Sequence, residues 1–252
     1  MDLRGKVAIV TAAAGAGIGH AVAHKLLKAG ADVMLTDSHP RRSFEVAQAL
    51  SQEFSREVPA CQVDVTKQEQ IESAVKTTME HFGHIDILCN VAGINKLEPI
   101  WSVSEETWRF VMNVCLDGTF RFIRTVLPHM LPRQQGAIVN ISSADGWIGS
   151  SEGEAAYCAA KAGVMGLTRA AAAEVGKYNI RVNAIAPGLI YNAYLEKIYP
   201  KEFFTETERL IPLGRVGTPE EVADLVCFLV SEEARYITGE VIAITGGRYM
   251  HA

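Results

Sequence analysis

Hydrophobic residues along the chain alternate between two spacings, one typical of buried strands and one typical of amphipathic helices. The first short run of hydrophobic and β-branched residues, residues 6–11, stops at a cluster of small residues. Beyond that cluster Ile18, Val22 and Leu26 recur at helical spacing, and residues 32–37 form a second strand-like run. This order predicts a strand, a glycine-containing turn, a helix and a second strand, which together make a βαβ unit.

The same alternation continues to the end of the chain. We expect further helices over residues 41–54, 68–82, 104–131, 155–176 and 219–230, and further strands over residues 58–65, 85–90, 137–142, 180–186 and 241–245. Several of these strands are almost wholly apolar, as expected for strands covered by helices on both faces. The predicted fold class is therefore α/β, a doubly wound sheet of about seven mainly parallel strands with helices on both faces.

No linker, repeat or low-complexity segment divides the sequence, so we expect residues 1–252 to form a single domain. Two helix starts carry the pattern of a capping box, in which Thr66 and Thr218 each precede a glutamate by three residues. The least regular part is the segment 188–215, which follows a proline-glycine turn and contains many aromatic and charged residues. We expect this segment to cover a substrate cleft.

Composition and charge narrow the possible functions. With 48% hydrophobic and 21% charged residues the chain is an ordinary globular protein, and its net charge of −5 argues against a nucleic-acid partner. No apolar run has membrane-spanning length and the first residues lack a signal-peptide layout, so we expect no membrane association and a cytoplasmic location. The five cysteines are widely spaced and the histidines lack ligand spacing, so neither disulfides nor a metal site is expected.

Tyr157 and Lys161 are the first candidates for chemistry. They are four residues apart in an alanine-rich run, so both side chains project from one face of the predicted helix. A neighbouring ammonium favours the phenolate form of tyrosine, and we expect it to move the pKa of Tyr157 towards neutrality. A solvated pair on a helix surface has the same spacing, so the pair alone leaves both interpretations open.

A glycine-rich turn containing Gly15, Gly17 and Gly19 follows the first strand and opens the first helix. Glycines there let the backbone approach a pyrophosphate, and the helix N-terminus favours its charge. Asp37 ends the second strand about 20 residues further on, the spacing at which a carboxylate meets an adenosine ribose. Because a carboxylate repels a 2′-phosphate, NAD is favoured over NADP. The basic pair at residues 41–42, which could reach a 2′-phosphate, favours the opposite choice.

Several motifs along essentially the whole chain resemble those of the short-chain dehydrogenase/reductase family, in its single-domain branch. The turn from Thr11 to Gly19 resembles Thr-Gly-x-x-x-Gly-x-Gly, with Ala12 in place of the first glycine and one extra residue, Asn90-Val91-Ala92-Gly93 resembles Asn-Asn-Ala-Gly, and Tyr157 with Lys161 matches Tyr-x-x-x-Lys. The similarity is greatest to members like the β-ketoacyl reductases and hydroxysteroid dehydrogenases. It implies that the chain is one NAD(P)-binding domain of the Rossmann type.

The resemblance also implies a set of cofactor contacts and four catalytic residues. The implied cofactor contacts are Gly15, Gly17, Ile18 and Gly19 in the turn, Asp37 at the ribose, Asp64 and Val65 at the adenine, Asn90, Ala92 and Gly93 after the fourth strand, Pro187, Gly188, Ile190 and Asn192 beside the nicotinamide, and Tyr157 and Lys161 themselves. The implied catalytic residues are Asn113, Ser143, Tyr157 and Lys161, with Ser142 as the alternative to Ser143.

In the implied reaction Tyr157 exchanges a proton with the substrate oxygen while a hydride passes to or from the nicotinamide. Ser143 donates a hydrogen bond to that oxygen. Lys161 lowers the pKa of Tyr157 and binds the nicotinamide ribose, and Asn113 holds a water in line with Lys161 so that the proton can reach solvent.

We therefore expect an NAD(H)-dependent oxidoreductase that interconverts a secondary alcohol and a ketone. The aromatic and apolar residues within 191–204 favour a bulky or hydrophobic small-molecule substrate, with a sugar or polyol as the alternative. A dinucleotide-binding sensor or regulatory protein with the same fold and little turnover is the competing hypothesis. The resemblance also implies self-association into a homotetramer or homodimer through the helices around residues 104–131 and 155–176.

Overall fold

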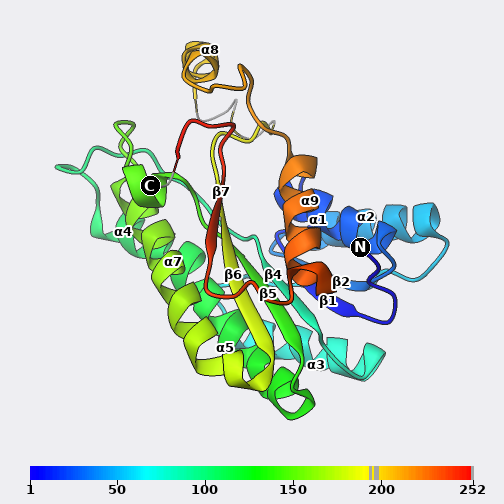
Figure 1. Ribbon diagram of the computed structural model, residues 1–252. Coiled ribbons are helices and arrows are strands. Elements are labelled where there is room, and N and C mark those ends of the chain that lie inside the picture. Colours follow the sequence, from blue (N-terminus) through cyan, green and yellow to red (C-terminus); the bar gives the residue numbers. More distant parts are fainter. Residues whose placement is uncertain (193–194, 196–198, 251–252) are drawn as a thin grey trace.

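A parallel sheet of seven strands lies at the centre of the computed structural model, which describes residues 1–192, 195 and 199–250 (Figure 1). The strands are β1 (Val7–Thr11), β2 (Asp32–Asp37), β3 (Ala60–Gln62), β4 (Ile87–Asn90), β5 (Gly136–Ile141), β6 (Ile180–Pro187) and β7 (Val241–Ile244). Their order in the sheet is β3-β2-β1-β4-β5-β6-β7, and each neighbouring pair is parallel. The predicted α/β class is confirmed. Successive strands are added on one side of β1 as far as β3 and then, from β4 onwards, on its other side, and folds of this kind bind ligands at the point between β1 and β4 where the order switches.

Helices cover both faces of the sheet (Figure 1). One face carries α1 (Ile18–Lys28), α2 (Pro40–Phe54) and α9 (Pro219–Val230), and the other carries α3 (Gln68–Phe82), α4 (Glu105–Met112), α5 (Gly118–Met130) and α7 (Ala155–Val175). The short helices α6 (Asp145–Ile148) and α8 (Lys201–Arg209) follow the carboxyl ends of β5 and β6. Within the described ranges no helix is long and apolar enough to cross a bilayer.

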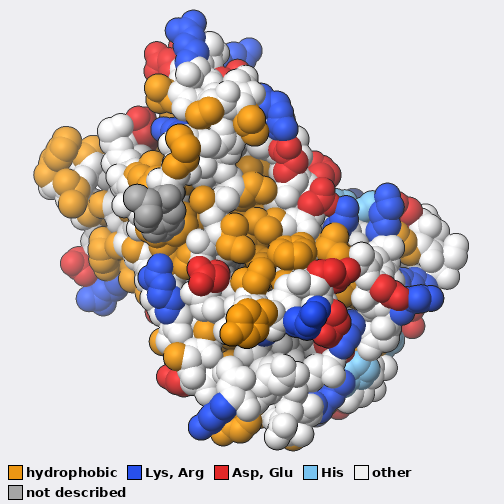
Figure 2. Space-filling model, viewed as in Figure 1, with side chains coloured by type: hydrophobic (Ala, Val, Ile, Leu, Met, Phe, Trp, Pro, Cys, Tyr) orange, Lys and Arg blue, Asp and Glu red, His pale blue; other side chains and the backbone are white. Residues whose placement is uncertain are grey.

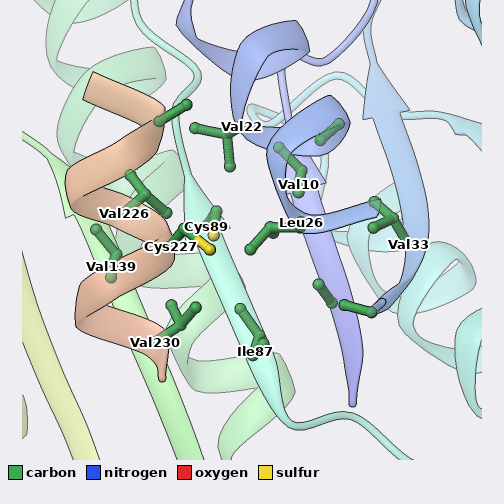
Figure 3. Close-up of a cluster of buried hydrophobic side chains, with 14 of the residues drawn as sticks. Val10, Val22, Leu26, Val33, Ile87, Cys89, Val139, Val226, Cys227 and Val230 are labelled. Atoms are coloured by element: carbon green, nitrogen blue, oxygen red, sulfur yellow. The ribbon is translucent and has the colours of Figure 1, made fainter. Parts of the chain in front are cut away.

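Branched hydrophobic side chains fill the layer between the sheet and the helices α1 and α9. Figure 3 shows Val10 of β1, Leu26 of α1 and Val226 of α9 among the members of this cluster, and all three are fully buried. Removing such side chains from water is the main favourable term in folding, at about 25 cal/mol per Å² of apolar surface. The cluster fixes α1 against β1, and so fixes the turn that joins them.

The helix predicted over residues 104–131 is interrupted. Between α4 and α5 lies a π-helical turn, η1 (Asn113–Asp117), and a 3₁₀ turn, η2 (Leu131–Arg133), follows α5. A π-helical turn accommodates an extra residue and rotates the residues around it, which hydrophobic spacing does not reveal. At its end Gly118 packs against Val65, where a Cβ atom would lie 2.8 Å from the valine Cγ2.

Two local predictions on the third βα unit are also wrong. The strand predicted over residues 58–65 is reduced to β3, because only three residues pair with the neighbouring strand. The Thr66 capping box does not form, since Thr66 donates from N and Oγ1 to Asp64 Oδ1 at 2.9 and 2.8 Å and Lys67 occupies the cap position of α3. The capping box of Thr218 at the start of α9 is confirmed.

Candidate active site

The structure brings Tyr157, Lys161 and Ser143 together at the carboxyl end of β5. Lys161 is 3% exposed, its Nζ donates to the carbonyl oxygen of Ile141 at 2.7 Å, and the same atom lies 5.5 Å from the centre of the Tyr157 ring. The Ser143 side chain acts to lower the pKa of the Tyr157 phenol, against the larger effect of desolvation. The alternative serine, Ser142, donates instead to the carbonyl oxygen of Lys161 at 2.8 Å, so Ser143 is the serine that faces the phenol.

A buried chain of hydrogen bonds ties α7 to the sheet. Asn90 Nδ2 of β4 donates to Asn140 Oδ1 of β5 at 2.9 Å, and Asn140 Nδ2 donates to Thr168 Oγ1 of α7 at 3.0 Å. Satisfied polar networks in a core are specific because a broken one leaves unpaired buried groups. The amide of Asn90, predicted to contact a cofactor, is used in this chain. The roles of Asn140 and Thr168 were not predicted, because a polar residue within an apolar strand does not reveal its partner.

Desolvation shifts the pKa values of Tyr157 and Lys161 in opposite directions. Desolvation raises the pKa of the Tyr157 phenol, and desolvation also lowers the pKa of the Lys161 ammonium. The expected movement of the Tyr157 pKa towards neutrality is therefore not what the structure shows. Desolvation therefore shifts each group towards its neutral form.

Asn113 begins the π-helical turn η1. Asn113 Oδ1 accepts a hydrogen bond from Arg121 at 2.7 Å. Two residues further along the π-helical turn, the fully buried Cys115 packs against Tyr157, and its thiol lies 3.3 Å from both the nitrogen and the oxygen of Ile94. The sequence contains no spacing signal for this arrangement, because the π-helical turn decides which residue faces α7.

A cavity of about 230 Å³ lies at the carboxyl ends of β1, β2 and β4. Five of the predicted cofactor contacts line it, namely Asp37, Asp64, Val65, Ala92 and Gly93. Gly93 also borders the lysine, since a Cβ atom there would lie 3.2 Å from Lys161 Nζ. The cavity and the catalytic group are therefore adjacent, as a dinucleotide that reaches Lys161 requires.

The glycine-rich turn has the close backbone approach that a phosphate site needs. A Cβ atom on Gly19 would lie 2.2 Å from the carbonyl oxygen of Ala12, so only glycine fits there. Ala12 has a φ of 54°, a conformation that favours glycine and explains the glycine at this place in the family motif. Gly17 caps α1 without a side-chain bond, so the first N–H groups of the helix, beginning at Ile18, are available to an anion. These features fit a pyrophosphate.

Thr11 connects the two loops that border the cofactor cavity, a role that was not predicted from the sequence. Thr11 Oγ1, at the end of β1, accepts hydrogen bonds from the backbone N–H of Val91 at 2.8 Å and of Ala92 at 2.9 Å. The side chain is 1% exposed. Thr11 therefore fixes the segment after β4 against the glycine-rich turn.

A second cavity of about 300 Å³ opens beside Tyr157. Its walls combine aromatic, apolar and charged side chains, including Tyr199, Phe203, Asp145, Glu154 and Arg248. Glu154 is 5% exposed and accepts hydrogen bonds from Tyr199 Oη and Asn95 Nδ2. The cavity is the candidate substrate site because it contains the phenol.

The four residues predicted beside the nicotinamide have different surroundings in the structure. Pro187 accepts a hydrogen bond from Ala144 at 2.9 Å, and Gly188 lines the second cavity. Ile190 is buried in the core, and Asn192 Oδ1 accepts from the backbone N–H of Leu195 at 3.3 Å. Residues 193–194 and 196–198 of the predicted covering segment lie outside the described residues.

Comparison with known proteins gives consistent matches over nearly the whole chain. A family model described as enoyl-(acyl carrier protein) reductase matches residues 12–248. A 3-oxoacyl-(acyl-carrier-protein) reductase of Thermotoga maritima is 40% identical over 247 residues, which cover 98% of this chain and 99% of the relative. The enzyme with the same description from Vibrio cholerae is 41% identical over 250 residues, covering 99% of this chain and 100% of the relative. A subunit of a hydroxy(phenyl)methylsuccinyl-CoA dehydrogenase from Thauera aromatica is 35% identical over the full length of both chains.

The predicted preference for NAD over NADP is wrong. The 3-oxoacyl-(acyl-carrier-protein) reductases that this chain matches are NADPH-dependent. In the structure the Asp37 carboxylate is hydrogen-bonded to the backbone. Its two oxygens accept the backbone N–H groups of Ala14 at 3.1 Å and His39 at 2.9 Å, so the carboxylate stabilises the turns around it.

The matched length, the level of identity and the parallel sheet agree with the motifs that suggested the family. The chain belongs to the short-chain dehydrogenase/reductase family of oxidoreductases, which interconvert ketones and alcohols.

Proposed function

We propose that Tyr157 is the general acid and base of a nicotinamide-dependent reductase. The observation that carries this proposal is the position of the phenol, which lines the second cavity and lies beside the buried Lys161. In reduction Tyr157 gives its proton to the carbonyl oxygen, and in oxidation it takes the proton of the alcohol. Ser143 holds the substrate oxygen at the phenol.

The residues around the first cavity would hold the dinucleotide. The glycine-rich turn and the start of α1 would bind its pyrophosphate, and Lys161 would bind the ribose next to the nicotinamide. When bound, the nicotinamide supplies or accepts the hydride. Gly93 leaves room for the ribose beside Lys161, because a side chain there would contact Nζ.

We infer that the substrate is a 3-oxoacyl thioester or a ketone of similar shape. Two of the relatives named above act on 3-oxoacyl groups carried by a protein. The mixed walls of the second cavity accommodate a chain with both polar and apolar parts. Tyr199 and Phe203, which line this cavity, stack with ring centres 4.2 Å apart and would contact an apolar part of the substrate. The single-domain organisation and the cytoplasmic location stay predictions.

The direct test is reduction of acetoacetyl-CoA and a panel of simple ketones with NADPH and NADH. We expect turnover by the wild type and a loss of about 10²–10⁴-fold in kcat for Tyr157→Phe, the range typical of a general acid. Tyr236→Phe is the matched control, because Tyr236 is 100% exposed. Full activity of Tyr157→Phe contradicts the mechanism, and dinucleotide binding without turnover on any ketone would support a sensor.

We infer that the basic pair at residues 41–42 contacts the 2′-phosphate of NADPH. Both arginines begin α2, directly after the Asp37 to His39 turn, and Arg42 is exposed. Arg41 forms an ion pair with Glu45 at 2.7 Å. We expect Arg42→Ala to raise the KM for NADPH about tenfold more than the KM for NADH, equivalent to about 1.4 kcal/mol of lost contact. An equal change in the two KM values would exclude this contact.

We infer that the protein self-associates through α4 and α5. Three large hydrophobic side chains are exposed there, Trp108 at 36% and Phe110 and Phe120 at 43% each. Hydrophobic side chains also gather on the face of the molecule over the edge strand β7 (Figure 2). Exposed apolar patches of this kind mark protein contacts. Light scattering should give a dimer or tetramer for the wild type and a smaller species for Phe120→Glu, and a monomeric wild type would contradict the inference.

A further inference from the structure

Glu154 is a buried carboxylate in the wall of the substrate cavity, three residues before Tyr157. It occupies the N-cap position of α7 and is 5% exposed. Its side chain and the phenol both line the second cavity. A ketone held at Tyr157 therefore shares one enclosed space with this carboxylate.

One oxygen of Glu154 is held by two hydrogen-bond donors. Tyr199 Oη and Asn95 Nδ2 both donate to Glu154 Oε1, and Asn95 Nδ2 also donates to Tyr199 Oη at 3.2 Å. Accepting several hydrogen bonds is typical of an ionised carboxylate, and the N-terminus of α7 stabilises a negative charge at this position. The three side chains come from the loop after β4, the start of α7 and the segment 188–215. The carboxylate therefore has a fixed position in the cavity wall.

The charges around the cavity favour an uncharged ligand over an anion. Among the described residues that line it, three carry a carboxylate and one carries a guanidinium, namely Asp145, Glu152, Glu154 and Arg248. Arg248 is exposed, and its charge acts on Asp145. No lysine or arginine of the described ranges forms an ion pair with Glu154, whose recorded partners are the uncharged Tyr199 and Asn95. The Glu154 charge is therefore available to act on a ligand, and burial limits its screening by water.

We propose that Glu154 determines substrate specificity by excluding ketones that carry a carboxylate beside the reacting carbonyl, while admitting their uncharged esters and thioesters. The proposal rests on the proposed function and adds to it the residue that selects the substrate. A 3-oxo acid bound at Tyr157 would bring its carboxylate into the space that Glu154 borders, and like charges placed together are strongly disfavoured. The matching ester has a similar shape and no charge, so repulsion alone separates the two.

The test compares acetoacetate with methyl acetoacetate, which share the 3-oxo group and differ in charge. We expect kcat/KM of the wild type to be at least about tenfold higher for the ester. Glu154→Gln should reduce this ratio to about threefold or less, mainly by lowering the KM for the acid, because the amide oxygen still accepts from Tyr199 and Asn95 while the charge is removed. Glu174→Gln is the matched control, since Glu174 is an exposed carboxylate of the same helix outside the cavity.

Glu154→Gln should also fold as well as the wild type. Asn95 Oδ1 is buried and accepts no hydrogen bond from the described residues, and the new amide N–H supplies a donor beside it. We expect an unchanged melting temperature for this variant. Glu154→Ala, which removes both hydrogen bonds, should instead be destabilised and should lose activity on acid and ester alike.

Binding without turnover gives a second readout. In Tyr157→Phe with NADPH bound, calorimetric titration should show tighter binding of methyl 3-hydroxybutyrate than of 3-hydroxybutyrate, and adding Glu154→Gln should remove most of the difference. A ratio of acid to ester that Glu154→Gln leaves unchanged, or an equal loss of both in that variant, would overturn this role of Glu154. A wild-type preference for the acid, or binding of neither ligand, would also overturn it. Turnover by Tyr157→Phe would instead contradict the proposed function and leave the comparison of acid and ester valid.

Discussion

Lys161 Nζ lies 5.5 Å from the centre of the Tyr157 ring; Lys161 is buried, whereas Tyr157 is partly buried and lines the second cavity. In water such a neighbour would favour the phenolate. Here burial dominates, raising the pKa of the phenol and lowering the pKa of the ammonium. A neutral phenol is the form that can donate a proton, as reduction by the proposed mechanism requires.

The raised pKa of Tyr157 predicts opposite pH dependences for the two directions. Oxidation needs the phenolate, whose fraction grows about tenfold per pH unit below the pKa, so kcat/KM for oxidation should rise from pH 7 to about pH 10. Reduction needs the phenol and should not increase with pH over this range. Initial rates in both directions check this, and an oxidation optimum below pH 7 would contradict it.

Substitutions in the π-helical turn should distinguish the contributions of Asn113 and Cys115 to activity. Asn113→Ala removes an Arg121 contact at the edge of the site, and we expect kcat within about threefold of wild type. Cys115→Leu places a larger side chain at a fully buried position beside Gly93, where overpacking costs about 1–3 kcal/mol, and should lower both kcat and dinucleotide affinity. Steady-state kinetics and dinucleotide titration measure both. A large loss of kcat in Asn113→Ala would restore the predicted role of that residue.

The glycine-rich turn offers a matched pair of substitutions. Gly19→Ala places a methyl group 2.2 Å from the Ala12 carbonyl oxygen, whereas the same methyl group on Gly17 meets nothing within 4 Å. We expect Gly19→Ala to lower dinucleotide affinity at least about tenfold and to destabilise the fold by about 1–3 kcal/mol. Gly17→Ala should change the fold stability by less than about 1 kcal/mol. Thermal unfolding with and without the dinucleotide distinguishes them, and equal effects would show that the turn has another path.

Replacing Ala12 by glycine should stabilise the protein. Ala12 adopts a φ of 54°, where an L-residue with a Cβ atom is disfavoured by about 1–2 kcal/mol relative to glycine. The larger entropy of glycine in the unfolded chain offsets part of this gain, so we expect a net gain of about 0.5–1 kcal/mol in the free energy of unfolding. Urea denaturation with an unchanged m-value would measure it. A loss of stability would show that Ala12 is not strained.

The alternation of buried strands and amphipathic helices was readable from the sequence because each element signals itself through its own period. The spacing of Tyr157 and Lys161 and the cluster of Gly15, Gly17 and Gly19 were also readable, because each lies within one short stretch of the chain. These local features were enough to give the fold class and the family. They did not give the cofactor preference, because Asp37 was read as free to bind a ribose and the structure engages it with two backbone N–H groups.

What the sequence determined by itself was the parallel α/β sheet, the family, and the placement of Tyr157, Lys161 and Ser143 in one group. Only the tertiary structure decided which neighbours these residues have. It turned Asn113 towards Arg121, set Cys115 against the phenol and bonded Asp145 to Ser143. It also buried Lys161 and partly buried the Tyr157 phenol, and this desolvation reversed the expected direction of the Tyr157 pKa. The physical reason is that periodicity fixes which face of an element is buried, whereas desolvation and hydrogen bonding depend on groups that other elements bring.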